Sequence, residues 1–315
     1  MVLDLSQKRS KAEVLFQAEM WAKAKTVTQK DKLVTNYGVR DSELNQLDYR
    51  DPVDHVVLGV MHNWLEGILQ NHFRNWWGFQ GKKKNRQRDY GVDDDHDEES
   101  EFEMDTDEDK NMTWIEDFDF PQESTEFLFS ANDRLQLLSL LRDVIIPSGI
   151  ETIPHNLGEA SHGKLKAAQW ASLFLYYIPL VISEILVPDV EDFCINSNRS
   201  MIMENTSSLV QCTQIVLSKA VTKASIDQFE LMYSRYIESS KNIFKVKSFR
   251  PNHHYALHIP EMMSYWGPLL GVSEFAGERL IGMLQKVTVN NKNDQMDATK
   301  IGRFCQVQRL YAQFD

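Results

Sequence analysis

The sequence is poor in cysteine. Its 315 residues include only three, Cys194, Cys212 and Cys305, and these lie far apart along the chain. Three isolated thiols provide neither a disulfide framework nor the C-x-x-C spacing of a zinc site. The N-terminal residues MVLDLSQKRSKAEV also lack the apolar segment of a secretory signal. We therefore expect a protein of a reducing compartment, nuclear or cytoplasmic, that is not secreted.

Long hydrophobic runs are also missing, because no stretch of 18 apolar residues occurs. The longest mostly apolar segment covers residues 171–187, and it is interrupted by Ser172, Pro179, Ser183 and Glu184. A membrane-spanning helix needs about 20 predominantly apolar residues. The segment therefore predicts a buried helix with a kink at the proline, and we expect no membrane partner.

The net charge of −12 comes from one short segment. Residues 93–109 hold twelve of the 46 acidic residues, and without those twelve the chain has 34 acidic against 34 basic residues. Residues 81–111, a basic run followed at once by this acidic run, are predicted to be a disordered loop. The basic run could be a nuclear-localisation or nucleic-acid patch, but neutralisation by its acidic neighbour is the simpler interpretation. The neutral remainder argues against strong duplex-DNA binding by this chain alone.

Several common motifs are absent. The sequence contains no glycine-rich phosphate loop, no G-x-S-x-G elbow and no H-E-x-x-H pattern. The segment 252–285 does concentrate His253, His254 and His258 ahead of a Trp266-Gly267-Pro268 break. Without further ligands at metal-site spacing, these histidines favour a structural role over a zinc site.

Hydrophobic periodicity predicts one helix after another. Apolar residues recur at spacings of three and four over residues 7–30, 53–80, 130–146, 202–221 and 225–246, whereas no segment alternates at period two. Ser130 and Asp133 form a predicted capping box ahead of a stripe made of Leu135, Leu138, Leu141 and Ile145. The fold class is therefore predominantly α.

Five segments follow from these patterns. Residues 1–50 form an N-terminal helix and a polar connector, and residues 51–80 form a helix that contains Met61, His62 and Asn63. A charged disordered insert covers 81–125, a helical domain covers 126–250, and a C-terminal block covers 251–315. In the second segment His62 lies off the apolar stripe beside Glu66 at i+4, a spacing that favours a structural His–Glu contact over a catalytic pair. Trp76, Trp77 and Phe79 are expected to pack at the end of this helix.

Three blocks together resemble a known family. They are GVMHNWLEGILQNHFRNWWG (59–78), LGEASHGKLKAAQW (157–170) with FLYYIPLVI (174–182), and HHYALHIPEMMSYWGPLLGVSEFAGERLIGMLQK (253–286). In order and spacing they are similar to the C-terminal half of fungal CACTA-like transposases of the Plavaka type. The resemblance covers nearly the whole chain and is weaker before residue 50.

The resemblance implies a DDE/D transposase, an enzyme in which three carboxylates on an RNase H-like core hold two Mg²⁺ or Mn²⁺ ions. A helical insertion precedes the third acid, which corresponds to Glu278 here, and this residue is the implied metal ligand. His62 corresponds to the histidine of a D-x-x-H motif. The helix bearing Glu278 is expected to begin at Ser273 or Phe275, with Glu274 on the same face, and to lie near His62.

Two departures limit the implied activity. Gly59 stands where the motif has its aspartate, and the first two carboxylates are expected before Met1. We therefore expect the isolated chain to be inactive, to bind no metal tightly, and to bind transposon DNA weakly or not at all. The alternatives are a non-enzymatic helical interaction protein, or a domesticated relic that binds itself or an intact transposase, and an unrelated α-helical protein. In a truncated enzyme, Trp76, Trp77, Tyr265 and Trp266 would form an apolar patch that promotes association.

Overall fold

The computed structural model describes residues 9–79, 129–157, 165–187, 194, 197–246, 249–287 and 296–312. Within these ranges the regular structure is entirely helical, which confirms the predominantly α fold class. The predicted charged insert, 81–125, lies wholly outside the described residues, as does most of the LGEASHGK sequence.

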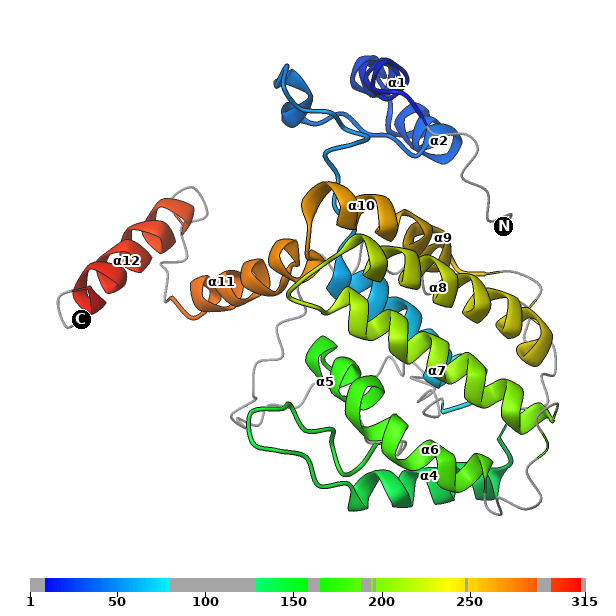
Figure 1. Ribbon diagram of the computed structural model, residues 1–315. Helices are drawn as coiled ribbons and strands as arrows, with labels where there is room; N and C mark the ends of the chain where they lie inside the picture. Colours follow the sequence, from blue (N-terminus) through cyan, green and yellow to red (C-terminus); the bar gives the residue numbers. More distant parts are fainter. Residues whose placement is uncertain are drawn as a thin grey trace, which may run out of the picture.

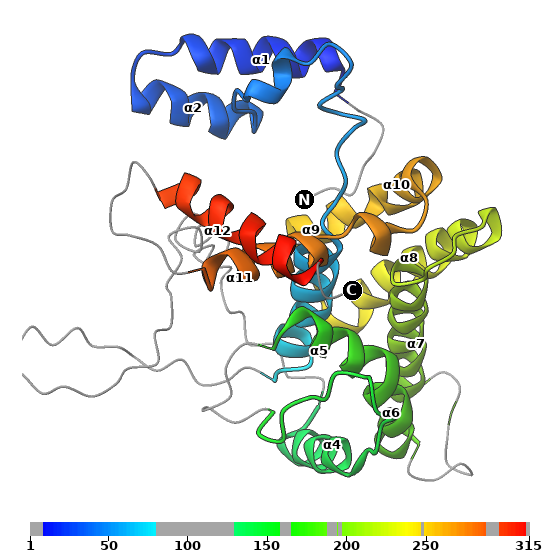
Figure 2. The same ribbon diagram turned by 90° about the vertical axis from the view of Figure 1, so that its left-hand side faces the viewer.

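The N-terminal region forms a hairpin of two helices, α1 (Lys11–Lys23) and α2 (Val27–Tyr37). A single helix over 7–30 was therefore a wrong prediction. Ala24 has extended backbone angles, and the Thr26 side chain then accepts a hydrogen bond from the Gln29 N–H, so a second helix begins. Figures 1 and 2 show this hairpin standing off the body of the molecule. A 3₁₀ turn, η1 (Glu43–Gln46), follows it.

The centre of the core is a helix with widened, π-type turns. It comprises η2 (Val60–Leu69) and η3 (His72–Trp76), so it begins at Val60 rather than at residue 53. Its buried side chains include Trp64, Leu65 and Ile68, each with no exposed surface. Trp77 and Phe79 are buried at its C-terminal end, which confirms the packing expected there.

Helix α4 (Ala131–Asp143) begins with the predicted capping box between Ser130 and Asp133. The predicted apolar stripe was partly wrong. Leu137 and Leu141 are buried, whereas Leu135 is 67% and Ile145 is 94% exposed. The helix already ends at Asp143, so Ile145 belongs to the loop that follows and cannot continue the stripe.

A continuous helix runs through α5 (Ala167–Ser172), η5 (Leu173–Tyr177) and α6 (Ile178–Leu186). Pro179 lies at the start of α6, directly after the π-type turn, where its missing N–H and its ring are accommodated by the widened helix. Among the described residues, this is the one helix long and apolar enough to cross a membrane, and 56% of its most apolar window is buried inside the molecule.

Two long helices, α7 (Asn198–Val216) and α8 (Lys223–Phe244), lie side by side (Figure 1). The predicted pair at 202–221 and 225–246 is thus confirmed with shifted ends. The Trp64 indole N–H donates to Thr213 Oγ1 at 3.1 Å, and its ring contacts Phe229 at 5.6 Å between centroids. These contacts fix the pair against η2.

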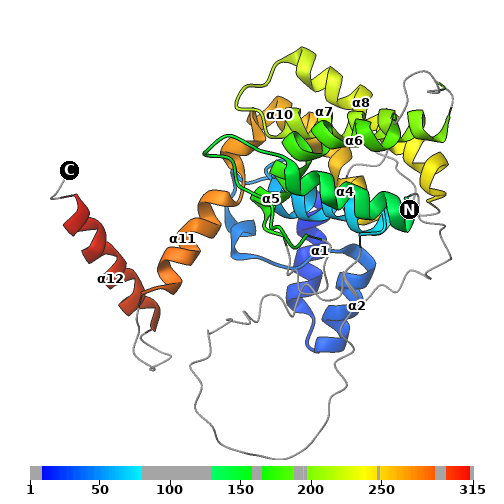
Figure 3. The same ribbon diagram turned by 90° about the horizontal axis from the view of Figure 1, so that it is seen from below.

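The C-terminal block is broken into short helices. They are α9 (Pro251–Tyr255), η6 (Ala256–His258), α10 (Ile259–Trp266), η7 (Leu269–Val272), α11 (Phe275–Gln285) and α12 (Met296–Tyr311). Gly267 ends α10 with a φ of 77°, which a residue with a side chain adopts at a cost. No residue of α11 is buried, and Figures 1 and 3 show α11 and α12 extending away from the body.

Candidate functional site

Helix η2 and the start of α11 bring together one histidine and three glutamates. His62 and Glu66 come from η2, Glu278 lies in the first turn of α11, and Glu274 is the residue just before that helix. The two predicted site residues, His62 and Glu278, thus lie close in space although about two thirds of the chain separates them. We call these four residues the His62 cluster.

His62 contacts a carboxylate through each ring nitrogen. Its Nδ1 lies 2.9 Å from Glu66 Oε2, the contact predicted from the i,i+4 spacing. Its Nε2 lies 3.9 Å from Glu278 Oε1. The side chains of His62 and Glu278 are 44% and 51% exposed, so both can be reached from solvent.

The Glu274 side chain contacts residues 59–61, at the start of η2. Its Oε2 accepts a hydrogen bond from the Met61 N–H at 3.2 Å. Its Oε1 lies 1.5 Å from the place that a Cβ at position 59 would take. Position 59 has no Cβ because it is a glycine, and the carboxylate fills that space. Sequence reasoning placed Glu274 on the Glu278 face but gave no signal for its contact with residues 59–61, which depends on the turn through η7.

The electrostatics of the cluster favour a protonated histidine. The pKa of His62 is raised above its ordinary value, first by the hydrogen bond to Glu66 and then by the negative charges of Glu66, Glu274 and Glu278. Partial burial opposes this rise. His62 is therefore a group that can hold a proton between two carboxylates at higher pH than an isolated histidine.

The described residues contain no group of three or more His, Cys, Asp or Glu side chains arranged to hold a metal ion. The four groups of the His62 cluster do not converge in this way, and one oxygen of Glu274 is engaged by Met61. Asp51 is used locally, since its carboxylate accepts the N–H groups of Val53 and Asp54. As placed, these residues do not fit a two-metal site.

The three histidines of the C-terminal block have separate environments. His253 is fully buried and stacks on Trp76 at 5.2 Å between ring centroids. The rings of His254 and His258 lie 5.5 Å apart, edge to face.

His72, in the central helix, is a second fully buried histidine, and its Nδ1 lies 3.2 Å from the Tyr236 hydroxyl. Burial lowers the pKa of both His72 and His253 to about 3.

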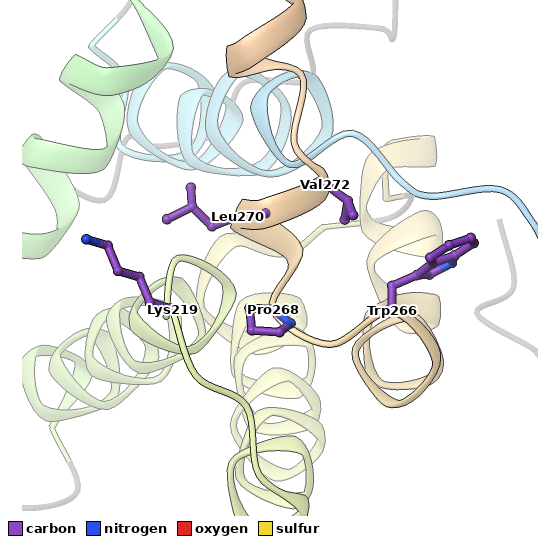
Figure 4. A pocket seen from close by; sticks show the side chains of 6 residues that line it. Lys219, Trp266, Pro268, Leu270 and Val272 are labelled. Atoms are coloured by element: carbon purple, nitrogen blue, oxygen red, sulfur yellow. The ribbon is translucent and has the colours of Figure 1, made fainter.

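A shallow hollow lies beside the Trp266-Gly267-Pro268 break (Figure 4). It is lined by residues of η7, by Trp266 and Pro268, and by Lys219 from the loop between α7 and α8. Its lining is largely apolar and includes no member of the His62 cluster. It provides no general acid, base or nucleophile apart from the Lys219 amine.

No family model, curated protein or solved structure matches this chain. The transposase resemblance, with the roles it implies for His62 and Glu278, therefore rests on the sequence blocks alone.

Proposed function

We propose that this chain is the helical C-terminal part of a DDE/D-type DNA transposase and contributes Glu278 and His62 to its catalytic unit. In this proposal the bundle formed by α4 to α8 corresponds to the helical insertion before the third acid. RNase H-like strands and the first two carboxylates come from outside the described residues. The substrate class is transposon DNA, and the compartment is the nucleus or the cytoplasm.

One observation carries the proposal, namely the approach of His62 Nε2 to within 3.9 Å of Glu278 Oε1. The motif resemblance singled out these two residues from blocks far apart in the sequence. Both are accessible, and the helix that carries Glu278 has no buried residue, although Phe275 at its start is partly buried against the core. An exposed carboxylate on an unburied helix beside a protonatable histidine is available to a further domain.

The described residues do not form a complete two-metal site. Two-metal catalysis needs carboxylates that hold the ions about 3.5–4 Å apart, and the His62 cluster does not offer that arrangement. Within the chain, Glu66 orients the ring of His62 through Nδ1, and this leaves Nε2 directed toward Glu278. We therefore assign no chemical step to the isolated chain and expect no DNA cleavage or strand transfer by it.

Paramagnetic relaxation by Mn²⁺ tests the role of Glu278. In NMR spectra of the purified chain, we expect only weak Mn²⁺ binding here, so that resonances around Glu278 and His62 broaden as the Mn²⁺ concentration rises, and we expect the Glu278→Gln variant to lose this local effect. The acidic run at 93–109 will also attract the ion, so broadening is compared residue by residue. Glu238→Gln, which removes an exposed carboxylate from α8, is the matched control. Broadening near Glu278 that persists in Glu278→Gln would contradict the assignment.

A nicking assay tests the completeness of the site. The chain is incubated with terminal-repeat DNA and Mg²⁺ or Mn²⁺, and we expect no product. Metal-dependent nicking that Glu278→Gln abolishes would show that the chain holds a complete site, contrary to this proposal.

The second candidate is a non-enzymatic interaction protein that binds itself or an intact transposase. It is favoured by the apolar side chains left exposed on α10, α11 and α12. The largest are Tyr265, Trp266, Leu280, Ile281, Met283, Ile301 and Val307. Exposed apolar surface of this kind marks a protein interface more often than a DNA contact.

A further inference from the structure

Gly59 and Glu274 fit each other sterically. A Cβ built on Gly59 would lie 1.5 Å from Oε1 of Glu274 and 2.7 Å from its Cδ, distances that unbonded atoms do not adopt. Any side chain at position 59 would therefore displace this carboxylate. The φ of Gly59 is −63°, which every residue type can adopt, so the backbone conformation does not itself require glycine here.

Glu274 also provides a hydrogen-bond acceptor for a backbone N–H at the beginning of η2. The first N–H groups of a helix have no partner within it, and the positive end of the helix dipole favours a negative charge. No side chain from the N-cap position serves η2, whose N-cap residue is Gly59. The Glu274 carboxylate accepts the Met61 N–H instead. Because the Glu274 carbonyl accepts the Glu278 N–H at 2.9 Å, one residue contacts both segments that carry the site.

We infer that Glu274 is the positioning residue of the His62 cluster. Its carboxylate caps η2 from α11 through the space left by Gly59, and this contact holds His62 beside Glu278. The roles of His62 and Glu278 rest on the proposed function, whereas the fit between Gly59 and Glu274 stands without it. The fit also gives a physical reason for glycine at position 59, where the resembling motif has an aspartate.

A double-mutant cycle tests the steric fit. Gly59→Ala and Glu274→Ala are each expected to lower Tm by about 2–4 °C, the effect of losing one helix cap in a domain of this size. The double variant should lose no more than Glu274→Ala alone, because the added methyl group enters the vacated space. Losses that simply add would overturn the inference. Gly271→Ala is the matched control, since a Cβ there meets nothing within 4 Å.

A local NMR readout separates positioning from general stability. In the wild-type chain we expect a nuclear Overhauser effect between the His62 ring and the Glu278 side chain. Glu274→Ala should abolish it while the core contact between Trp64 and Phe229 persists, and Glu274→Gln, which keeps an acceptor oxygen, should retain it. Persistence in Glu274→Ala would overturn the inference, even if Gly59→Ala fails to fold. Neither metal nor DNA is present, so this outcome is independent of the Mn²⁺ test.

Discussion

At the scale of single residues, the chain places its histidines in opposite environments. His62 is half exposed among carboxylates, which raise its pKa. His72 and His253 are fully buried among aromatic rings, where burial lowers the pKa of each to about 3. Their ordinary pKa is 6.5. In acid the charge on His62 therefore stabilises the folded chain, whereas the two buried histidines destabilise it.

The two buried histidines, His72 and His253, predict that the folded chain loses stability in acid. A histidine whose pKa is lowered in the folded chain is neutral in both the folded and the unfolded chain above pH 6.5, so it does not change the free energy of unfolding there. As pH falls below 6.5 the unfolded chain takes up the proton first, and each buried histidine removes about 1.4 kcal/mol of stability per pH unit until about pH 3. His253→Phe should lower the pH slope by about one such contribution between pH 6 and pH 4.

The measurement is the free energy of unfolding from urea titrations at successive pH values. Phenylalanine is similar in size and can keep the ring stacking on Trp76, so at neutral pH we expect a change of no more than about 1.5 kcal/mol. Exposed His155→Gln is the control and should keep the wild-type slope. An unchanged slope in His253→Phe would show that this ring is not excluded from protons in the folded state.

At the scale of helices, the sequence predicted that most of the helices exist, but it predicted their end residues and their buried faces less well. The capping box at Ser130 and the i,i+4 contact of His62 with Glu66 are local, so spacing alone predicted both. The split between α1 and α2 has a weaker local signal, the Thr26 cap. The buried face of α4 is set by α6, which packs against it, and no local pattern specifies that neighbour.

The candidate site shows the same limit. His62 and Glu278 were singled out by motif resemblance, and their distance could not be predicted because it depends on turns through η6, Gly267 and η7. The contact of Glu274 with Gly59 and Met61 could not be predicted at all, because no sequence pattern links a glycine with a distant glutamate.

The pairing of α7 with α8 depends on a buried amide. Asn205 Nδ2 lies 3.1 Å from the Tyr236 carbonyl, 2.7 Å from Ser239 Oγ and 2.9 Å from Ser240 Oγ. Asn205→Ala should reduce the free energy of unfolding by about 1–3 kcal/mol, because buried acceptors lose their donor. Chemical denaturation measures the change. Gln214→Ala, on the exposed face of α7, should stay within about 0.5 kcal/mol, and equal losses in the two variants would contradict this role.

At the scale of the whole molecule, exposed apolar side chains occur in many elements, from Phe16 on α1 to Val307 on α12. The expectation that Trp76 and Trp77 pack on a missing domain was wrong, because Trp77 has no exposed surface and Trp76 stacks on Phe244 and His253. Tyr265 and Trp266 are 60% and 37% exposed. Of the four aromatic residues expected to form an apolar patch, the two on α10 are therefore exposed and the two at the end of the central helix are packed.

This distribution predicts self-association through α11. Leu280, Ile281 and Met283 are exposed on a helix with no buried residue, and burying such side chains against a second copy stabilises a dimer by about 25 cal/mol per Å² of apolar area, less the cost of association. Sedimentation velocity over a wide range of concentrations should show a rising mean mass. Replacing Ile281 and Met283 together by lysine should abolish this rise. Leu231→Lys changes a similarly exposed residue on α8 and should leave it intact. A chain that stays monomeric at every concentration would contradict self-association through α11.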